Sequence, residues 1–67
     1  MVDTLRNRLR EARAERGWTQ ADLAERVGVT RKTINTVENG VFVPSTVLAL
    51  KLARVLETPV EGLFELP

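Results

Sequence analysis

The segment from residue 31 to residue 39, RKTINTVEN, carries side chains whose types and spacing could do specific chemistry. At about 100° per residue, Ile34 and Val37 point to one side of a helix, so the other side is polar. That polar side and its flanks carry Lys32, Asn35, Thr36, Asn39, Arg31 and Thr33. Basic donors, an amide and a threonine methyl suit the edges of nucleic-acid bases, but an ordinary solvated face has the same composition. The segment alone leaves both interpretations open.

Catalytic chemistry has few candidates in this chain. There is no cysteine and no histidine, which removes thiolate nucleophiles and the commonest metal-ligand sets. Ser45 therefore lacks a histidine partner, the carboxylates are scattered, and no glycine-rich phosphate loop is present. We expect no enzymatic activity, no cofactor and no metal, and no small-molecule ligand is evident.

Capping residues and helical spacing predict five helices that would position the polar face. The first covers 4–16, the second 20–27, the third 31–39, the fourth 46–57, and a short last helix starts at Pro59 with Thr58 as its cap. Thr19 and Asp22 form a capping box before the second helix, and Thr30 caps the third. Two helices joined by a short glycine-containing turn, here over 19–40, are typical of a helix-turn-helix.

Three side chains near this unit have a structural and a functional interpretation. Gln20 could hold a phosphate together with the unpaired N–H groups of its helix terminus, or it could be merely solvated. Trp18 precedes the Thr19 cap and is expected to pack in the core rather than to serve as a ligand platform. Glu38 lies between the apolar and the polar faces, and we pair it with Arg13 of the first helix as a structural ion pair.

An apolar linker, Val41 to Val43, follows the third helix and is unusual for a loop. Either Phe42 folds back on the core or the linker meets a partner. The fourth helix is apolar on more than one stripe, which predicts burial on two sides. The two ends of the chain could also form a very short β pairing, with Val2 and Leu66 in contact.

Size and charge limit the remaining possibilities. The 67 residues have room for one domain, and the formal net charge is +1, which by itself predicts no partner. Arginines crowd the first sixteen residues and glutamates the C-terminus, so the charge is asymmetric. No apolar run approaches the roughly 18 residues of a membrane span. We expect a soluble, cytoplasmic protein without membrane association.

The run TQADLAERVGVTRKTINTVENG, followed by a Pro-Ser helix start, resembles the Cro/C1-type (xenobiotic-response-element) helix-turn-helix family. The resemblance covers nearly the whole chain. It implies an all-α fold, a compact five-helix bundle of the lambda-repressor-like DNA-binding type. It further implies a nucleoid-associated, sequence-specific transcriptional regulator, in particular a repressor, that binds a palindromic operator in double-stranded DNA as a homodimer. The helix at about 31–39 would enter the major groove.

The resemblance also implies residue roles. The expected base-reading residues are Arg31, Lys32, Asn35 and Thr36. The expected DNA-backbone contacts are Thr19, Gln20, Thr30, Thr33 and Asn39. The resemblance pairs Arg13 with Glu38, as the helical wheel does. Because the family often has polar residues where this chain has its apolar linker, the linker is expected to pack or to form a dimer contact. The possible dimer contacts are Phe42, Val43, Val47 and Leu66. An antitoxin-like or other protein-binding module is the alternative function.

Overall fold

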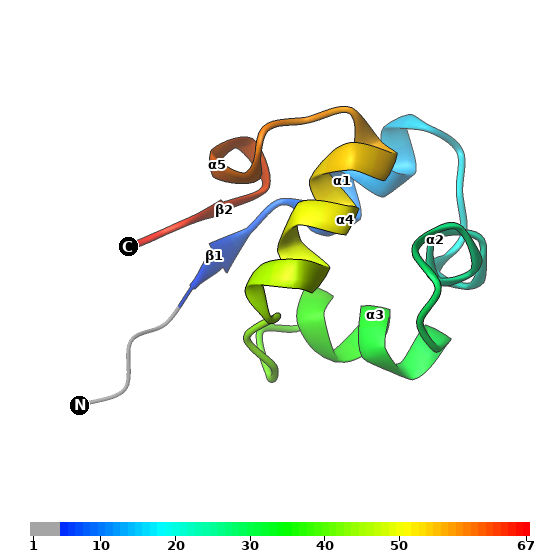
Figure 1. The fold of residues 1–67 in the computed structure, drawn as a ribbon, viewed down its shortest axis with the longest axis horizontal. Coiled ribbons are helices and arrows are strands. Elements are labelled where there is room, and N and C mark those ends of the chain that lie inside the picture. The colour runs from blue at the N-terminus through cyan, green and yellow to red at the C-terminus, as the bar shows by residue number, and fades with distance from the viewer. Residues whose placement is uncertain (1–4) are drawn as a thin grey trace.

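The computed structural model describes residues 5–67 as helices packed around one core, with a two-stranded sheet joining the ends (Figure 1). In chain order the elements are β1 (Arg6–Asn7), α1 (Leu9–Glu15), α2 (Gln20–Val27), α3 (Arg31–Glu38), α4 (Thr46–Leu56), α5 (Val60–Leu63) and β2 (Phe64–Glu65). The expected all-α bundle of five helices with a very short terminal β pairing is confirmed. The contact of Val2 with Leu66 that the sequence suggested lies outside the described residues. In the described part of the chain, no helix is long and apolar enough to cross a membrane.

Local capping sets the start of each helix that positions the polar face. The Thr19 side chain accepts a hydrogen bond from the Asp22 N–H, and the Asp22 carboxylate accepts from the Thr19 N–H, so the capping box is formed. Thr30 caps α3 in the same way by accepting from the Thr33 N–H. Between them Gly28 ends α2 with a φ of 86°, a left-handed conformation that costs glycine little. Residues close in sequence therefore define the turn between α2 and α3.

The core contains side chains from every helix. The fully buried ones are Leu9, Leu23, Ile34, Val37, Leu52, Leu56 and Leu63. Trp18 is half-buried and packs against this core, as expected from its position before the Thr19 cap. Since Ile34 and Val37 are the buried residues of α3, the core fixes which face of that helix is turned outward.

The N-terminal boundary of α1 differs from the sequence expectation. The predicted start, Thr4, lies outside the described residues, and α1 begins only at Leu9. Arg6 pairs with Glu65 and Asn7 with Phe64 in an antiparallel register, so this backbone is extended rather than helical. The Asn7 side chain then accepts a hydrogen bond from the Leu9 N–H. Pairing with the distant C-terminus therefore overrides the helical spacing of Leu5 and Leu9.

One further boundary prediction was wrong, at the junction of α4 and α5. Helix α4 ends at Leu56, as expected within one residue, because Glu57 has a left-handed φ of 51°. The Thr58 N–H binds the Ala53 carbonyl and its hydroxyl donates to the Leu56 carbonyl, so Thr58 completes the end of α4 instead of capping α5. Pro59 is the cap position of α5 rather than its first residue.

Helix α4 is not buried on two sides within the chain. Leu48, Leu52 and Leu56 face the core, but Val47 and Leu50 are 63% and 57% exposed. Within residues 5–67 the predicted burial on a second side is therefore not found. Instead, the second stripe lies on the surface.

Candidate nucleic-acid interface

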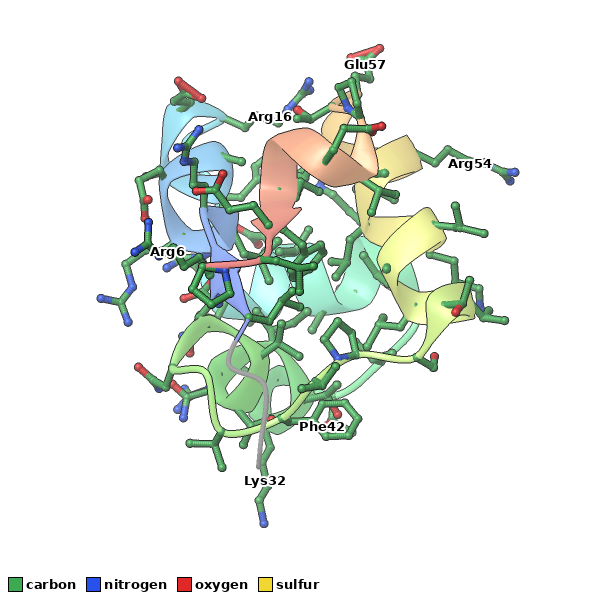
Figure 2. All side chains as sticks on the ribbon, turned by 90° about the vertical axis from the view of Figure 1, so that its left-hand side faces the viewer. Arg6, Arg16, Lys32, Phe42, Arg54 and Glu57 are labelled. Carbon is green, nitrogen blue, oxygen red and sulfur yellow. The ribbon has the colours of Figure 1, made fainter. Side chains whose placement is uncertain are left out.

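Helix α3 presents a polar face to solvent. Its cap Thr30 and the buried Ile34 and Val37 hold the helix, while Arg31, Lys32 and Asn35 are exposed. Thr33 and Thr36 are half-buried at the edges of this face, and Asn39 is exposed at its end. Figure 2 shows Lys32 projecting away from the rest of the molecule, at the opposite end from Arg16 and Glu57.

An ion pair anchors this helix to α1. Arg13 Nε lies 2.7 Å from Glu38 Oε2, and Arg13 Nη2 donates to Glu38 Oε1 at 3.2 Å. The Glu38 side chain is 0% exposed and that of Arg13 is 15% exposed, so water screens the pair little. Arg13 also donates to the Trp18 carbonyl at 2.8 Å, which ties the segment before α2 to the same group. The side chains that the sequence pairs thus join α1, α2 and α3.

Burial and hydrogen bonding act on Glu38 in opposite directions. Burial favours the neutral acid and would raise the pKa of Glu38, but hydrogen bonds from Arg13 and Gln20 outweigh it and hold this pKa below its ordinary value of 4.5. The pKa of Arg13 is raised, first by its hydrogen bond to Glu38. The pair is therefore charged at neutral pH, and Glu38 can only accept hydrogen bonds.

A polar network extends from this pair to the outward face of α3. Gln20 Nε2 donates to Glu38 Oε1 at 3.1 Å and to Asn35 Oδ1 at 3.2 Å. Asn39 Nδ2 donates to Asn35 Oδ1 at 3.0 Å, and Arg10 Nη2 donates to Asn39 Oδ1 at 3.1 Å. Arg10, whose Nε also lies 3.5 Å from Glu38, was not among the expected site residues. Its spacing of three residues from Arg13 on α1 could have indicated that both reach one partner.

This network changes the interpretation of Gln20 and Asn39. Both amide hydrogens of Gln20 have protein acceptors, and Asn39 Nδ2 donates to the Asn35 carbonyl as well as to Asn35 Oδ1. Their side-chain donors are thus engaged within the protein. The acceptors all lie on α3, Asn35 for both amides and Glu38 for Gln20. The phosphate contacts of the two side chains stay a prediction.

The other side chains predicted to contact DNA are of two kinds: threonines whose hydroxyls form hydrogen bonds within the protein, and basic residues that form no ion pair within residues 5–67. The Thr30 and Thr33 hydroxyls bond each other at 3.0 Å, and the Thr36 hydroxyl donates to the Thr33 carbonyl at 2.9 Å. Within residues 5–67, the side chains of Arg31 and Lys32 form no ion pair. Arg31 also lines a shallow recess of about 540 Å³ together with Thr19, Gln20 and Ala21, at the start of α2. Exposed positive charge and helix N–H groups therefore adjoin each other.

Trp18 has a further contact that the sequence did not indicate. The guanidinium of Arg26 lies 4.2 Å from the centre of the indole ring, and that of Arg16 lies 5.5 Å from it. Such cation–π contacts stabilise by about 0.5–1 kcal/mol at exposed sites. The Trp18 ring thus links the residue after α1, Arg16, to Arg26 of α2.

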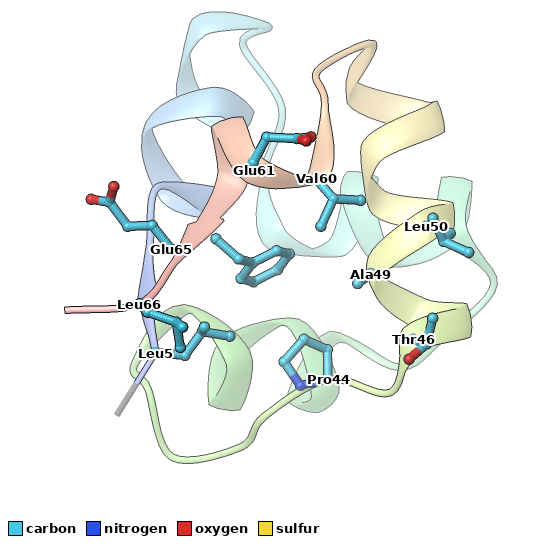
Figure 3. Close-up of a pocket in the computed structure, with 10 residues that line it drawn as sticks. Leu5, Pro44, Thr46, Ala49, Leu50, Val60, Glu61, Glu65 and Leu66 are labelled. Carbon is cyan, nitrogen blue, oxygen red and sulfur yellow. The ribbon is translucent and has the colours of Figure 1, made fainter. Parts of the chain in front are cut away.

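Apolar side chains on the far side of α4 and beyond α3 remain exposed. Phe42 is 46% exposed, so it does not fold fully onto the core, and Val41, Val43 and Leu66 are also exposed. An apolar recess of about 570 Å³, with Leu66 and Leu5 in its lining, lies between α4, α5 and β2 (Figure 3). Leu50 lines this recess, although it was not among the expected dimer contacts. We call the surface formed by Val47, Leu50 and Leu66 the apolar face.

The fold and this outward-facing helix are those of a known family. A family model described as helix-turn-helix, of the Cro/C1 type, matches residues 9–63. The chain belongs to this family of DNA-binding transcriptional regulators, and the resemblance noted in the sequence is confirmed. The chain is 50% identical over 60 residues to an uncharacterized HTH-type transcriptional regulator of Archaeoglobus fulgidus, covering 90% of this chain and 86% of the relative.

Two solved structures are similar over most of their length. One is the restriction-modification controller protein C.AhdI from Aeromonas hydrophila, with a TM-score of 0.77 and 38% identity, covering 82% of this chain and 83% of that one. The other is SinR, the master regulator for biofilm formation, in complex with DNA, with a TM-score of 0.75 and 29% identity. The alignment with SinR covers 81% of this chain and 87% of that chain.

Proposed function

We propose that this protein is a sequence-specific repressor that binds a palindromic operator as a homodimer, with α3 in the major groove. The observation that carries the proposal is the outward face of α3. There Arg31 and Lys32, which form no ion pair within residues 5–67, extend from a helix held by the part-buried Arg13–Glu38 pair. A helix fixed at one angle presents its side chains to base edges in a defined register. Membership of a family of DNA-binding transcriptional regulators supports the same conclusion.

The proposed contacts with DNA are assigned to groups whose hydrogen-bonding capacity is not used within the described residues. Arg31 and Lys32 are proposed to donate to guanine acceptors, and the Thr36 methyl to contact a thymine methyl, since the Thr36 hydroxyl donates to the Thr33 carbonyl. The phosphate contacts are proposed at the starts of α2 and α3, from Thr19, Thr30 and Thr33 and from helix N–H groups, including that of Gln20. Asn39 would border the phosphate backbone at the end of α3.

The homodimer is proposed to form through the apolar face, with the linker residues Phe42 and Val43 at its edge. Val47 and Leu50 are more than half exposed in the isolated chain, and burial of such side chains against a second copy is favourable. Two-fold symmetry is the commonest form of association. It would place two copies of α3 about 34 Å apart, on half-sites separated by one helical turn. Occupancy of a promoter by such a dimer would block transcription.

Selection of bound duplexes from a random pool tests the proposal. We expect a palindromic motif, bound with an affinity that falls as salt is raised, because phosphate contacts release counterions. Arg31→Ala and Lys32→Ala should each relax the preference at a motif position, by about 1–3 kcal/mol. Arg6→Ala is the matched control, since Arg6 is exposed on β1, away from Lys32 (Figure 2). A pool without any preferred sequence would refute the proposal and favour the alternative of a protein-binding module.

A further inference from the structure

The side-chain amide of Asn35 lies on the exposed face of α3. Its oxygen and its NH₂ group differ in how far they are engaged within the protein. An asparagine usually recognises adenine, accepting from N6 through its oxygen while donating to N7. That pairing requires a free oxygen. The orientation of the Asn35 amide can be deduced from two nearby charged groups. One of them can only accept hydrogen bonds and the other can only donate them.

The first neighbour is Glu38, a carboxylate that can only accept. Since Gln20 contacts Glu38 Oε1 at 3.1 Å, it must use its NH₂ group there, and the same nitrogen lies 3.2 Å from the Asn35 amide. The atom of Asn35 that faces Gln20 is therefore the oxygen. The charge on Glu38, fixed by Arg13, sets this orientation from beneath the surface.

The second neighbour is Arg10, a guanidinium that can only donate. It contacts the Asn39 amide at 3.1 Å, so the atom of Asn39 that it meets is the oxygen. The Asn39 NH₂ group then faces Asn35, 3.0 Å from Oδ1 and 2.9 Å from the Asn35 carbonyl oxygen. An independent contact, starting on α1, thus assigns the same orientation to Asn35.

Both acceptor sites of Asn35 Oδ1 are consequently filled, by Gln20 and by Asn39. The Nδ2 group makes no hydrogen bond within residues 5–67 and lies on an exposed side chain. Turning the amide over would bring its NH₂ group against two other NH₂ groups and lose both bonds. In this protein Asn35 offers donors alone.

We propose that Asn35 is a specificity-determining residue that acts as a donor and selects guanine, not adenine, at the base pair it faces. Guanine presents two acceptors, N7 and O6, in the major groove, whereas adenine presents one acceptor and one donor and thymine one acceptor beside a methyl. Gln20, Asn39 and Arg10 are positioning residues that hold Asn35 in this state. The inference rests on the proposed function, because it needs α3 to lie in the major groove.

The test compares motifs selected by three proteins from one random pool. The unsubstituted protein should select guanine at the position that Asn35 faces, and Asn35→Ala should lose the preference there alone. The double variant Gln20→Ala, Asn39→Ala frees the Asn35 oxygen and should accept adenine about as well as guanine at that position. Replacing this guanine by 7-deazaguanine, which lacks the N7 acceptor, should weaken binding of the unsubstituted protein about fivefold or more and leave Asn35→Ala unaffected.

The outcomes separate this inference from the proposed function. If the unsubstituted protein selects a motif, but the position erased by Asn35→Ala is adenine, the inference is overturned and the proposed function stands. If Asn35→Ala leaves the motif unchanged at every position, the inference is likewise overturned and the proposed function stands. If no motif emerges for the unsubstituted protein, both fail. Should the double variant not fold, as judged by circular dichroism, the Asn35→Ala and 7-deazaguanine arms still decide the question.

Discussion

Glu38→Gln preserves the size of a buried side chain and removes the charge that faces Arg13. The two residues share hydrogen bonds of 2.7 and 3.2 Å, and the Glu38 side chain is 0% exposed. In the variant the guanidinium stays between α1 and α3 without a counter-charge. We therefore expect a loss of folding stability, since an uncompensated buried charge is costly.

The magnitude follows from the environment of Arg13. Removing one partner of a buried ion pair costs about 3–5 kcal/mol. The lower end applies, because Arg13 keeps its bond to the Trp18 carbonyl, its side chain is 15% exposed, and glutamine retains one acceptor. At roughly 0.05–0.15 kcal/mol per residue the whole domain has about 3–10 kcal/mol of stability. A loss of about 3 kcal/mol should lower the Tm by roughly 12–24 °C in a domain of this size.

Thermal unfolding followed by circular dichroism measures this loss at neutral pH. Glu25→Gln is the matched control, because it removes the same charge from an exposed position on α2 and should change the Tm little. Arg13→Met tests the coupling, since the loss in the double variant should be smaller than the sum of the two single losses. An unchanged Tm in Glu38→Gln, or additive losses in the double variant, would refute the argument that this pair anchors α3.

Three further results are expected. Because hydrogen bonds hold the pKa of Glu38 below its ordinary value of 4.5, although burial raises it, the unfolded chain takes up the proton first as the pH falls. The stability that Glu38 contributes should thus be complete above that value and lost below it, in urea unfolding from about pH 6 to about pH 3. Ser45→Ala removes the acceptor for the Leu48 N–H at the start of α4 and should cost about 1 kcal/mol in the same assay. Leu50→Glu should convert the proposed dimer to monomer in sedimentation equilibrium, whereas Ala14→Glu, on the exposed side of α1, should not.

Each of these three predictions would be contradicted by a specific result. If Glu38→Gln shows the same acid dependence as the unsubstituted protein, another carboxylate is responsible for it. Since aspartate also caps helices well, Ser45→Asp should restore the stability lost in Ser45→Ala, and failure to do so would remove capping as the explanation. A dimer that survives Leu50→Glu would place the interface away from the apolar face.

The sequence was sufficient where a structural signal lies within one turn of chain. The capping box of Thr19 and Asp22, the Thr30 cap and the left-handed Gly28 each involve residues at most three apart, so α2, the turn and α3 were located correctly. The orientation of α3 was also predictable, because Ile34 and Val37 define its buried side. The family resemblance is recognisable from the sequence for the same reason, since it rests on these local signals.

Contacts between distant segments could not be predicted in this way. Pairing of β1 with β2 moved the start of α1 to Leu9. The assignment of Thr58 to the end of α4 is local, but the sequence did not indicate it because a glutamate, Glu57, rather than a glycine takes the left-handed conformation there. The second apolar stripe of α4 looked like core from its composition, yet it lies on the surface. A sequence pattern records which residues are apolar but not how many neighbours are available to cover them.

The polar face of α3 combines both kinds of information. Its residue types and their outward direction were determined by the sequence alone, through helical spacing and local caps. Which groups on that face remain free was decided only by the tertiary structure, because Gln20, Asn35 and Asn39 meet Arg10 and Glu38 where three helices converge. An amide has a donor and an acceptor end, and its orientation depends on charged neighbours that are distant in sequence.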